Sequence, residues 1–214
     1  MDDEVEYDIR LAAVIQLKNA TRYAWLSYPD EEGKNFIRST ILSAIVAIQH
    51  HKIQKFLCII LRNICYADFP EQLPDLQQQI IQYFHNTDLP SLIGASNAAF
   101  IVIDTYQTLT GIRDFSIDYL LSGIHERMLG LCEDLVKPEV FSLDSAELLR
   151  RILRIIFLIV RSSLMFAPFS ESPFFQRWMI VIFKVYAYEL PPSTAVCSFL
   201  SLCQYVSHDH LTSF

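Results

Sequence analysis

Apolar residues recur at helical spacing along almost the whole chain, and proline, glycine or polar clusters separate one apolar block from the next. This periodicity predicts a succession of amphipathic helices. The five glycines are scattered, so the close-set turns of a many-stranded sheet are not visible. We expect helices over about residues 8–25, 35–48, 52–66, 70–84, 90–109, 117–135, 142–165, 175–188 and 194–206. Asp8, Asp68 and Ser142 are the predicted N-caps of three of them.

Short turns between the predicted helices imply antiparallel neighbours, which fit either a helical bundle or a solenoid. An internal repeat favours the solenoid. Residues 9–19 and 53–63 match at most apolar positions, and both segments end in leucine, a basic residue and asparagine. Their offset is close to one HEAT unit, which spans roughly 40–47 residues. A single pairing of this kind leaves the bundle open.

The charge and composition of the chain exclude some classes of function and favour others. The net charge is −7 and the pI is about 5.3, which argues against nucleic-acid binding and favours basic partners. Only 19% of residues are charged and 52% are hydrophobic, so much of the surface must be buried within the chain or against other proteins.

The cysteines indicate a reducing compartment, because their number is odd and no C-x-x-C spacing occurs. The most apolar stretch, residues 152–166, contains Arg154 and Arg161, so we expect no membrane insertion. No signal peptide is recognised, since the first seven residues are acidic. No phosphate-binding loop, nucleophile elbow or zinc-protease motif is present, so we expect neither an enzyme nor a cofactor. His208–His210 could contribute two metal ligands, but we predict that they lie in a frayed tail.

Two motifs resemble a known family. Residues 8–19 read D-I-R-L-A-A-V-I-Q-L-K-N, with Trp25 shortly after, and residues 67–76 read A-D-F-P-E-Q-L-P-D-L. In this order and separation they resemble the N-terminal region of importin-β nuclear transport receptors. Leu73 stands where that family usually has tryptophan.

The resemblance implies an all-α, HEAT-like solenoid of about four to five repeats, in which the first helix of the first repeat is missing. It implies an acidic N-terminal tail at 1–7, importin-β-like repeats at 8–109, further HEAT-like repeats at 110–206 and a frayed tail at 207–214. It also implies that Arg10 is a structural residue between neighbouring repeats.

The function implied by the resemblance is that of a nuclear transport receptor segment. Such a segment would bind the GTP form of Ran, take part in protein import and shuttle between nucleus and cytoplasm. The implied Ran-binding residues are Lys18 and Asn19, with Arg62 and Asn63 as their repeat equivalents. The implied partners also include cargo proteins with basic signals, for which Asp104 is a candidate contact, and Phe-Gly nucleoporins. Aromatic residues that could border nucleoporin grooves are Phe84, Phe115, Phe174, Phe175 and Trp178. The alternative is a HEAT or armadillo scaffold without a GTPase partner.

Overall fold

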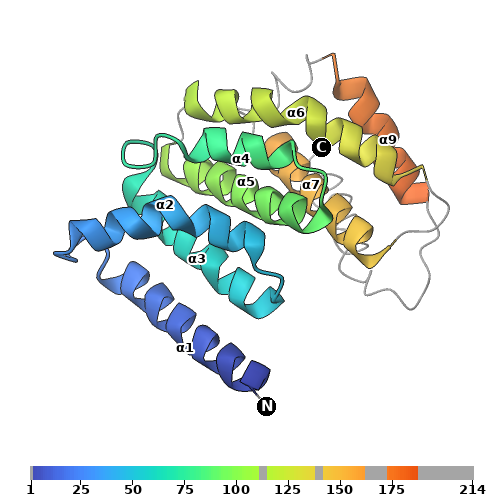
Figure 1. Ribbon diagram of the computed structural model, residues 1–214. Coiled ribbons are helices and arrows are strands. Elements are labelled where there is room, and N and C mark those ends of the chain that lie inside the picture. The colour runs from blue at the N-terminus through green and yellow to red at the C-terminus, as the bar shows by residue number, and fades with distance from the viewer. Residues whose placement is uncertain (1, 111–114, 138–141, 162–172, 188–214) are drawn as a thin grey trace, which may run out of the picture. The chain divides into compact units, whose positions relative to one another are not determined.

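The computed structural model describes residues 2–110, 115–137, 142–161 and 173–187, and within these ranges it contains eight helices and no strand (Figure 1). The helices are α1 (Asp2–Tyr23), α2 (Glu31–Ala47), α3 (His51–Asp68), α4 (Leu76–Phe84), α5 (Leu89–Thr110), α6 (Phe115–Leu135), α7 (Leu143–Arg161) and α9 (Phe175–Ala187). The predicted helix at 194–206 and the residues His208–His210 lie outside the described ranges. No described helix is long and apolar enough to cross a membrane.

Most predicted helices are found within a few residues of their expected bounds, but α1 starts earlier than expected. It begins at Asp2 rather than at Asp8, so residues 2–7 are helical. Negative charge in the first turn of a helix is generally favourable because of the helix dipole, so an acidic segment such as residues 2–4 can begin one. The charge pattern that suggests a solvated tail is therefore also compatible with the start of a helix.

The fourth helix starts later than expected. It was predicted from Pro70, with Asp68 as its N-cap, but α4 begins at Leu76. Residues 69–75 form turns, with Leu73 N–H donating to the Pro70 carbonyl and Leu76 N–H to the Leu73 carbonyl. Pro74 is close enough to Pro70 to interrupt a helix that started there, because proline lacks the N–H that an interior position requires. The peptide bond between Phe69 and Pro70 is cis.

The chain divides into two compact units, residues 1–124 and residues 125–214, and the boundary falls within α6. In unit 1, α2 and α3 form one antiparallel helix pair and α4 and α5 form the next. Helix α1 lies along α3, and α3 lies along α5. Buried residues along these helices form the core of unit 1, including Ile41, Leu42, Ile45, Ile53, Ile60, Leu61, Ile64, Ile80, Phe84 and Leu92. This succession of helix pairs is an all-α, HEAT-like repeat solenoid, as the sequence predicts.

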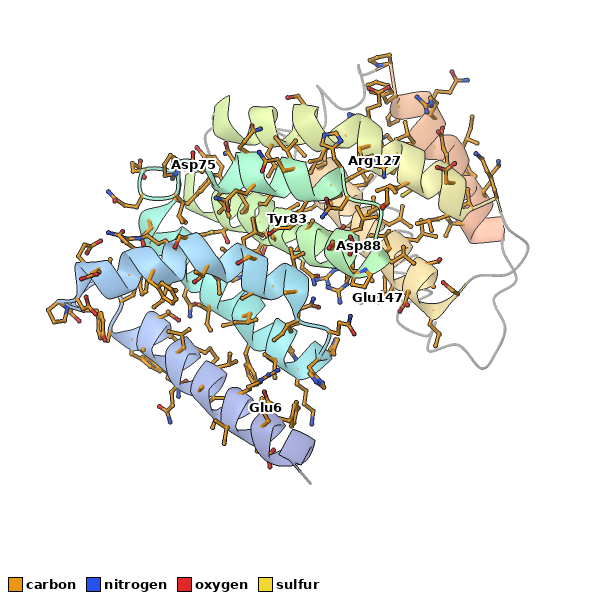
Figure 2. The ribbon with its side chains drawn as sticks, viewed as in Figure 1. Glu6, Asp75, Tyr83, Asp88, Arg127 and Glu147 are labelled. Atoms are coloured by element: carbon orange, nitrogen blue, oxygen red, sulfur yellow. The ribbon has the colours of Figure 1, made fainter. Side chains whose placement is uncertain are left out.

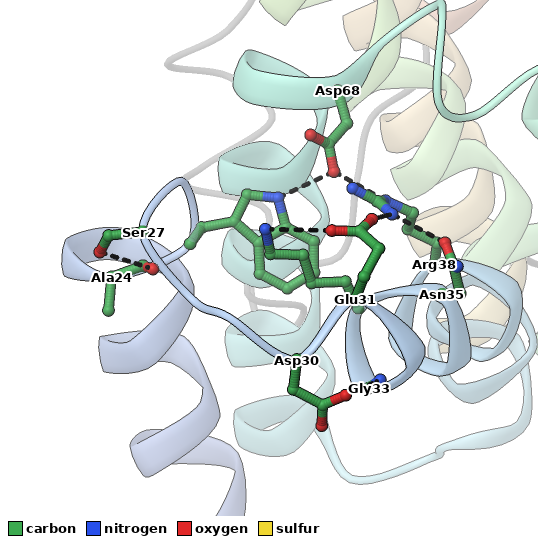
Figure 3. Close-up of polar contacts among 10 residues, drawn as sticks. Ala24, Ser27, Asp30, Glu31, Gly33, Asn35, Arg38 and Asp68 are labelled. Atoms are coloured by element: carbon green, nitrogen blue, oxygen red, sulfur yellow. Dashed lines mark hydrogen bonds and ion pairs between the residues drawn. The ribbon is translucent and has the colours of Figure 1, made fainter.

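Trp25, Arg38 and Asp68 lock the α1–α2 connection onto the end of α3 (Figure 3). Asp68 accepts hydrogen bonds from Trp25 Nε1 and from Arg38 Nε, both at 2.8 Å. The Arg38 and Asp68 side chains are each only 8% exposed. Glu31 and Asn35 also accept hydrogen bonds from Arg38. Asp68 is thus the last residue of α3 and an acceptor for the preceding helices, not the cap of α4.

In this cluster, hydrogen bonds and charge pairing together affect the pKa of Arg38 more than burial does. Burial acts to lower the pKa of Arg38, but the hydrogen bonds to Asp68 and Glu31 raise it above its usual value. The Lys34 ammonium lies 5.8 Å from the Trp25 ring centroid, and the Arg38 guanidinium carbon lies 5.6 Å from it. The cluster therefore combines an ion pair, an indole hydrogen bond and two cation–π contacts around one buried tryptophan.

In unit 2, the fully buried Trp178 of α9 packs against His125 of α6. Trp178 Nε1 donates to His125 Nε2 at 2.5 Å, so the imidazole accepts through this nitrogen. Arg177 forms an ion pair with Glu133 of α6 beside this contact, and Phe174 meets the imidazole edge-on. Burial lowers the pKa of His125 below 6.5.

We expect acidification to destabilise the packing of α9 on α6. An indole N–H is a donor only, so an imidazolium that lacks a free lone pair at Nε2 cannot accept from it. Because the folded pKa of His125 lies below its unfolded value of 6.5, stability should decline as the pH falls from about 6.5 towards the folded pKa. Thermal melts across this range should show a steeper decline for the native chain than for His125→Gln. His85→Gln, at an exposed histidine of unit 1, should retain the native slope. Equal slopes for all three chains would contradict the assignment.

Candidate protein-interaction face

Helices α1, α3 and α5 are parallel, and polar side chains link each of them to the next. Asn63 Nδ2 donates to Thr21 Oγ1 at 3.2 Å, which joins α3 to α1. Arg62 pairs with Asp104 at 2.9 Å, which joins α3 to α5. These two contacts each span 42 residues, close to the offset of the internal repeat. An equal sequence separation at the two contacts is what parallel second helices of successive repeats require.

Gln54 forms a second link between α3 and α5. Its Nε2 donates to the carbonyls of Ile45 and Ile48 at the end of α2, at 3.0 and 3.3 Å. Its Oε1 accepts from Asn97 Nδ2 of α5 at 3.3 Å. The buried Gln54 amide therefore supplies a hydrogen-bond donor to backbone carbonyls at the C-terminal end of α2 and fixes the register of α3 against α5.

Lys18 and Asn19, the first predicted pair, lie on α1 and are both partly exposed. The Lys18 ammonium is 5.2 Å from the centroid of the Phe56 ring on α3. This cation–π contact restrains the lysine near the line where α1 meets α3, while it stays accessible to solvent. Lys18 is therefore oriented towards the neighbouring repeat and not away from it.

Arg62 and Asn63, the second predicted pair, have structural partners. Arg62 pairs with Asp104, so that this candidate cargo contact is already engaged within the chain. Asn63 is bonded to Thr21. The Arg62 side chain remains partly exposed, so it can still contact another protein, whereas Asn63 serves mainly to connect α3 to α1.

The structure adds basic residues that motif matching missed. Lys52, Lys55 and Arg62 follow one another at helical steps of three or seven residues and lie on the solvent side of α3, with Tyr66 at the end of the same stripe. Exposed Arg22 continues the positive charge on α1. We call Lys18, Arg22, Lys52, Lys55 and Arg62 the basic face. The sequence signal for it is the 3.6-residue periodicity of lysine and arginine in residues 52–62.

The basic face has a sign opposite to that of the whole chain. Between residues 9 and 23 there is no acidic residue, and the only acidic residue of α3 is the buried Asp68. The negative charge of this region is concentrated instead at the N-termini of α1 and α2. The net charge of −7 therefore does not describe the surface of α3 and of the second half of α1, which suits an acidic partner.

Other predicted residues have structural roles. Phe84 and Trp178 are fully buried, so neither borders a surface groove. Phe174 and Phe175 are partly buried, and the side chain of Phe115 lies outside those that the structure describes. Arg10 pairs with Glu6 one turn earlier in α1, so this contact does not link repeats as the resemblance implied. Among the described residues, no group of three or more histidine, cysteine or acidic side chains is arranged to bind a metal.

Comparison with known proteins gives two matches. Residues 1–47 match the family model of the importin-beta N-terminal domain. An "Importin beta-like SAD2 homolog" from Arabidopsis thaliana is 24% identical over 198 residues, which cover 89% of this chain and 19% of that protein. The chain thus spans about a fifth of the length of this relative. No solved structure matches the chain.

Proposed function

We propose that the chain binds the GTP form of Ran through the basic face and takes part in protein import into the nucleus. It belongs to the importin-β family of nuclear transport receptors and corresponds to the N-terminal region of such a receptor. The observation that carries the proposal is the concentration of Lys18, Arg22, Lys52, Lys55 and Arg62 on neighbouring parallel helices of an otherwise acidic chain. Localisation in both nucleus and cytoplasm is part of the same proposal.

The physical basis is electrostatic complementarity. Lysine and arginine side chains that converge on one surface attract an acidic protein and form charge-assisted hydrogen bonds with its carboxylates. The α1–α3 packing sets the spacing of the helix positions that carry these cations before the partner arrives, which reduces the entropy lost on binding. Selectivity for the GTP form would come from those surfaces of Ran that change with the bound nucleotide.

Cargo release follows from linkage between two ligands. In a HEAT solenoid each repeat contacts only its neighbours, so that small rotations between repeats accumulate along the chain. If cargo and the GTPase prefer different curvatures, binding of one weakens binding of the other. Cargo with basic signals would be repelled by the basic face, so on this proposal it binds elsewhere on the receptor.

Lys18→Glu is expected to weaken binding of Ran-GTP by about tenfold or more, because it replaces an attractive contact with a repulsive one. Lys55→Glu, which tests the part of the face not found from motifs, should act in the same direction. The measurement is binding of the purified chain to Ran loaded with GTP and, separately, with GDP, at two salt concentrations. We expect selective binding of the GTP form that weakens with salt.

Lys184→Glu is the matched control, since Lys184 is exposed on α9 and makes the same change of charge in unit 2. It should bind like the native chain. Equal losses for Lys18→Glu and Lys184→Glu would indicate a general charge effect and contradict a defined interface. Absence of binding in either nucleotide state, from a chain with a native helical spectrum, would favour the scaffold without a GTPase partner.

A further inference from the structure

Arg62 differs from the other cations of the basic face, because it has a carboxylate partner within the chain. Its Nη2 donates to Asp104 Oδ2 of α5 at 2.9 Å. Within the described part of the chain, no ion pair is formed by the other members of the face, Lys18, Arg22, Lys52 and Lys55. The fold therefore partly neutralises the charge of Arg62 and leaves those of the others available to a ligand.

The Arg62–Asp104 ion pair is accessible to solvent. The Arg62 side chain is 39% exposed and the Asp104 side chain is 25% exposed. Arg38, by contrast, is 8% exposed and donates to three side chains, including the equally buried Asp68. Water and salt weaken an exposed pair far more than a buried one, so the Arg62–Asp104 pair opens easily. A carboxylate that approaches from solvent can therefore reach Arg62, whereas Arg38 is held by the cluster around Trp25.

Arg62 also lies in the path of any acidic ligand that binds along α3. Lys55 is seven residues earlier on the same side of the helix, and the exposed Tyr66 is one turn later. A ligand that covers this stripe brings its own carboxylates to Arg62, where Asp104 is already bound. Two carboxylates then converge on one guanidinium in a place that water can reach, and their like charges repel each other. Binding of one therefore disfavours binding of the other.

We propose that Asp104 is an internal competitor for acidic ligands of the basic face: its carboxylate occupies Arg62 in the free chain, and a ligand must displace it to bind there. The inference rests on the proposed function for the identity of the partner, but it holds for any acidic ligand of the face. Asp104 lowers the affinity for every ligand that uses Arg62. Because the same ion pair joins α3 to α5, a bound ligand also removes one link between these repeats.

Asp104→Asn is expected to tighten binding of two ligands, Ran-GTP and a fluorescent oligo-glutamate peptide, by about three- to tenfold. Asparagine is close to aspartate in shape and keeps one acceptor oxygen, so the variant should retain the native helical spectrum by circular dichroism. Fluorescence anisotropy at low salt measures binding of the peptide without any GTPase. Lys55→Glu should weaken that binding, which locates the peptide on the basic face.

Two controls separate competition from a general effect of charge. Asp75→Asn removes the same charge at an exposed position just before α4 (Figure 2) and should change either affinity by less than about twofold. The second control repeats Asp104→Asn in an Arg62→Gln chain. The gain in affinity should be clearly smaller there, because only the repulsion between Asp104 and the ligand remains to be relieved.

Weaker or unchanged peptide binding by the Asp104→Asn chain would overturn the inference, and weaker binding would show that Asp104 positions Arg62 for the ligand. Equal gains for Asp104→Asn and Asp75→Asn, or equal gains with and without Arg62, would also overturn it. The same holds if neither the native nor the Asp104→Asn chain binds the peptide. Peptide binding in the expected pattern without binding of Ran-GTP would support the competition and reject the proposed GTPase partner.

Discussion

Asp68→Ala is expected to lower the free energy of unfolding of unit 1 by about 2–4 kcal/mol. The substitution leaves the buried Arg38 guanidinium without its buried partner and leaves Trp25 Nε1 without its acceptor. Breaking one side of a buried ion pair typically costs about 3–5 kcal/mol, and we take a lower range because Arg38 keeps its contact with the exposed Glu31. Asp68→Asn should cost less than alanine, since its amide oxygen can still accept one hydrogen bond.

Urea denaturation followed by circular dichroism and by tryptophan fluorescence measures this effect. Asp75→Ala is the matched control, because Asp75 is exposed and makes no side-chain capping bond to α4 (Figure 2). It should change the free energy of unfolding by less than about 0.5 kcal/mol. Similar losses for the two alanine variants would show that the Trp25–Arg38–Asp68 cluster does not stabilise the fold as described.

Gly94→Ala is expected to destabilise unit 1 by about 1–3 kcal/mol. A methyl group at Gly94 in α5 would lie 2.7 Å from the Cα of Val46 and 3.2 Å from the carbonyl oxygen of Ile45, both in the backbone of α2. Alanine is the better helix former by about 1 kcal/mol, so the two effects oppose each other. Steric overlap prevails because backbone atoms cannot move aside without displacing α2 from α5.

Gly130→Ala provides a control with the opposite sign. Gly130 also lies within a helix, but a methyl group there would have no neighbour within 4 Å. The gain in helix propensity should then appear alone, as a stabilisation of about 0.5–1 kcal/mol. Thermal denaturation of both variants should therefore give shifts of the melting temperature in opposite directions. A stabilised Gly94→Ala chain would contradict the close approach of α2 and α5.

The sequence predicts helix positions well where one apolar stripe follows another without interruption. The bounds of α3 and α5 follow from such stripes. Helix α2 begins at Glu31, four residues before its expected start, because the Asp30 carboxylate accepts from Gly33 N–H at 2.9 Å and caps the helix there. Prediction fails at Asp68, because an aspartate two residues before a proline has the same local pattern whether it caps the next helix or pairs with distant residues. The partners Trp25 and Arg38 are 43 and 30 positions away, and no local rule identifies them.

The candidate interface was predicted in part. The internal repeat pairs Lys18–Asn19 with Arg62–Asn63 as equivalents, and the two pairs lie on neighbouring parallel helices. The repeat could not reveal that Arg62 and Asn63 have intramolecular partners, since a hydrogen bond between repeats depends on the rotation of each helix about its axis. Lys52 and Lys55 were overlooked because they belong to no motif, although their periodicity was visible in the sequence. The net charge of the whole chain was also misleading, because it sums over surfaces of opposite sign.

The contacts between successive repeats differ in stiffness. The end of α3 is held to the α1–α2 connection by the buried Asp68 contacts, which cannot slide without stranding a charge. Further along, α3 and α5 are joined by the Arg62–Asp104 ion pair, whose side chains are partly exposed. Such a contact exchanges readily with water and yields at little energetic expense. When unit 1 flexes, we expect the deformation to concentrate between α3 and α5, while α1, α2 and the end of α3 move as one rigid body.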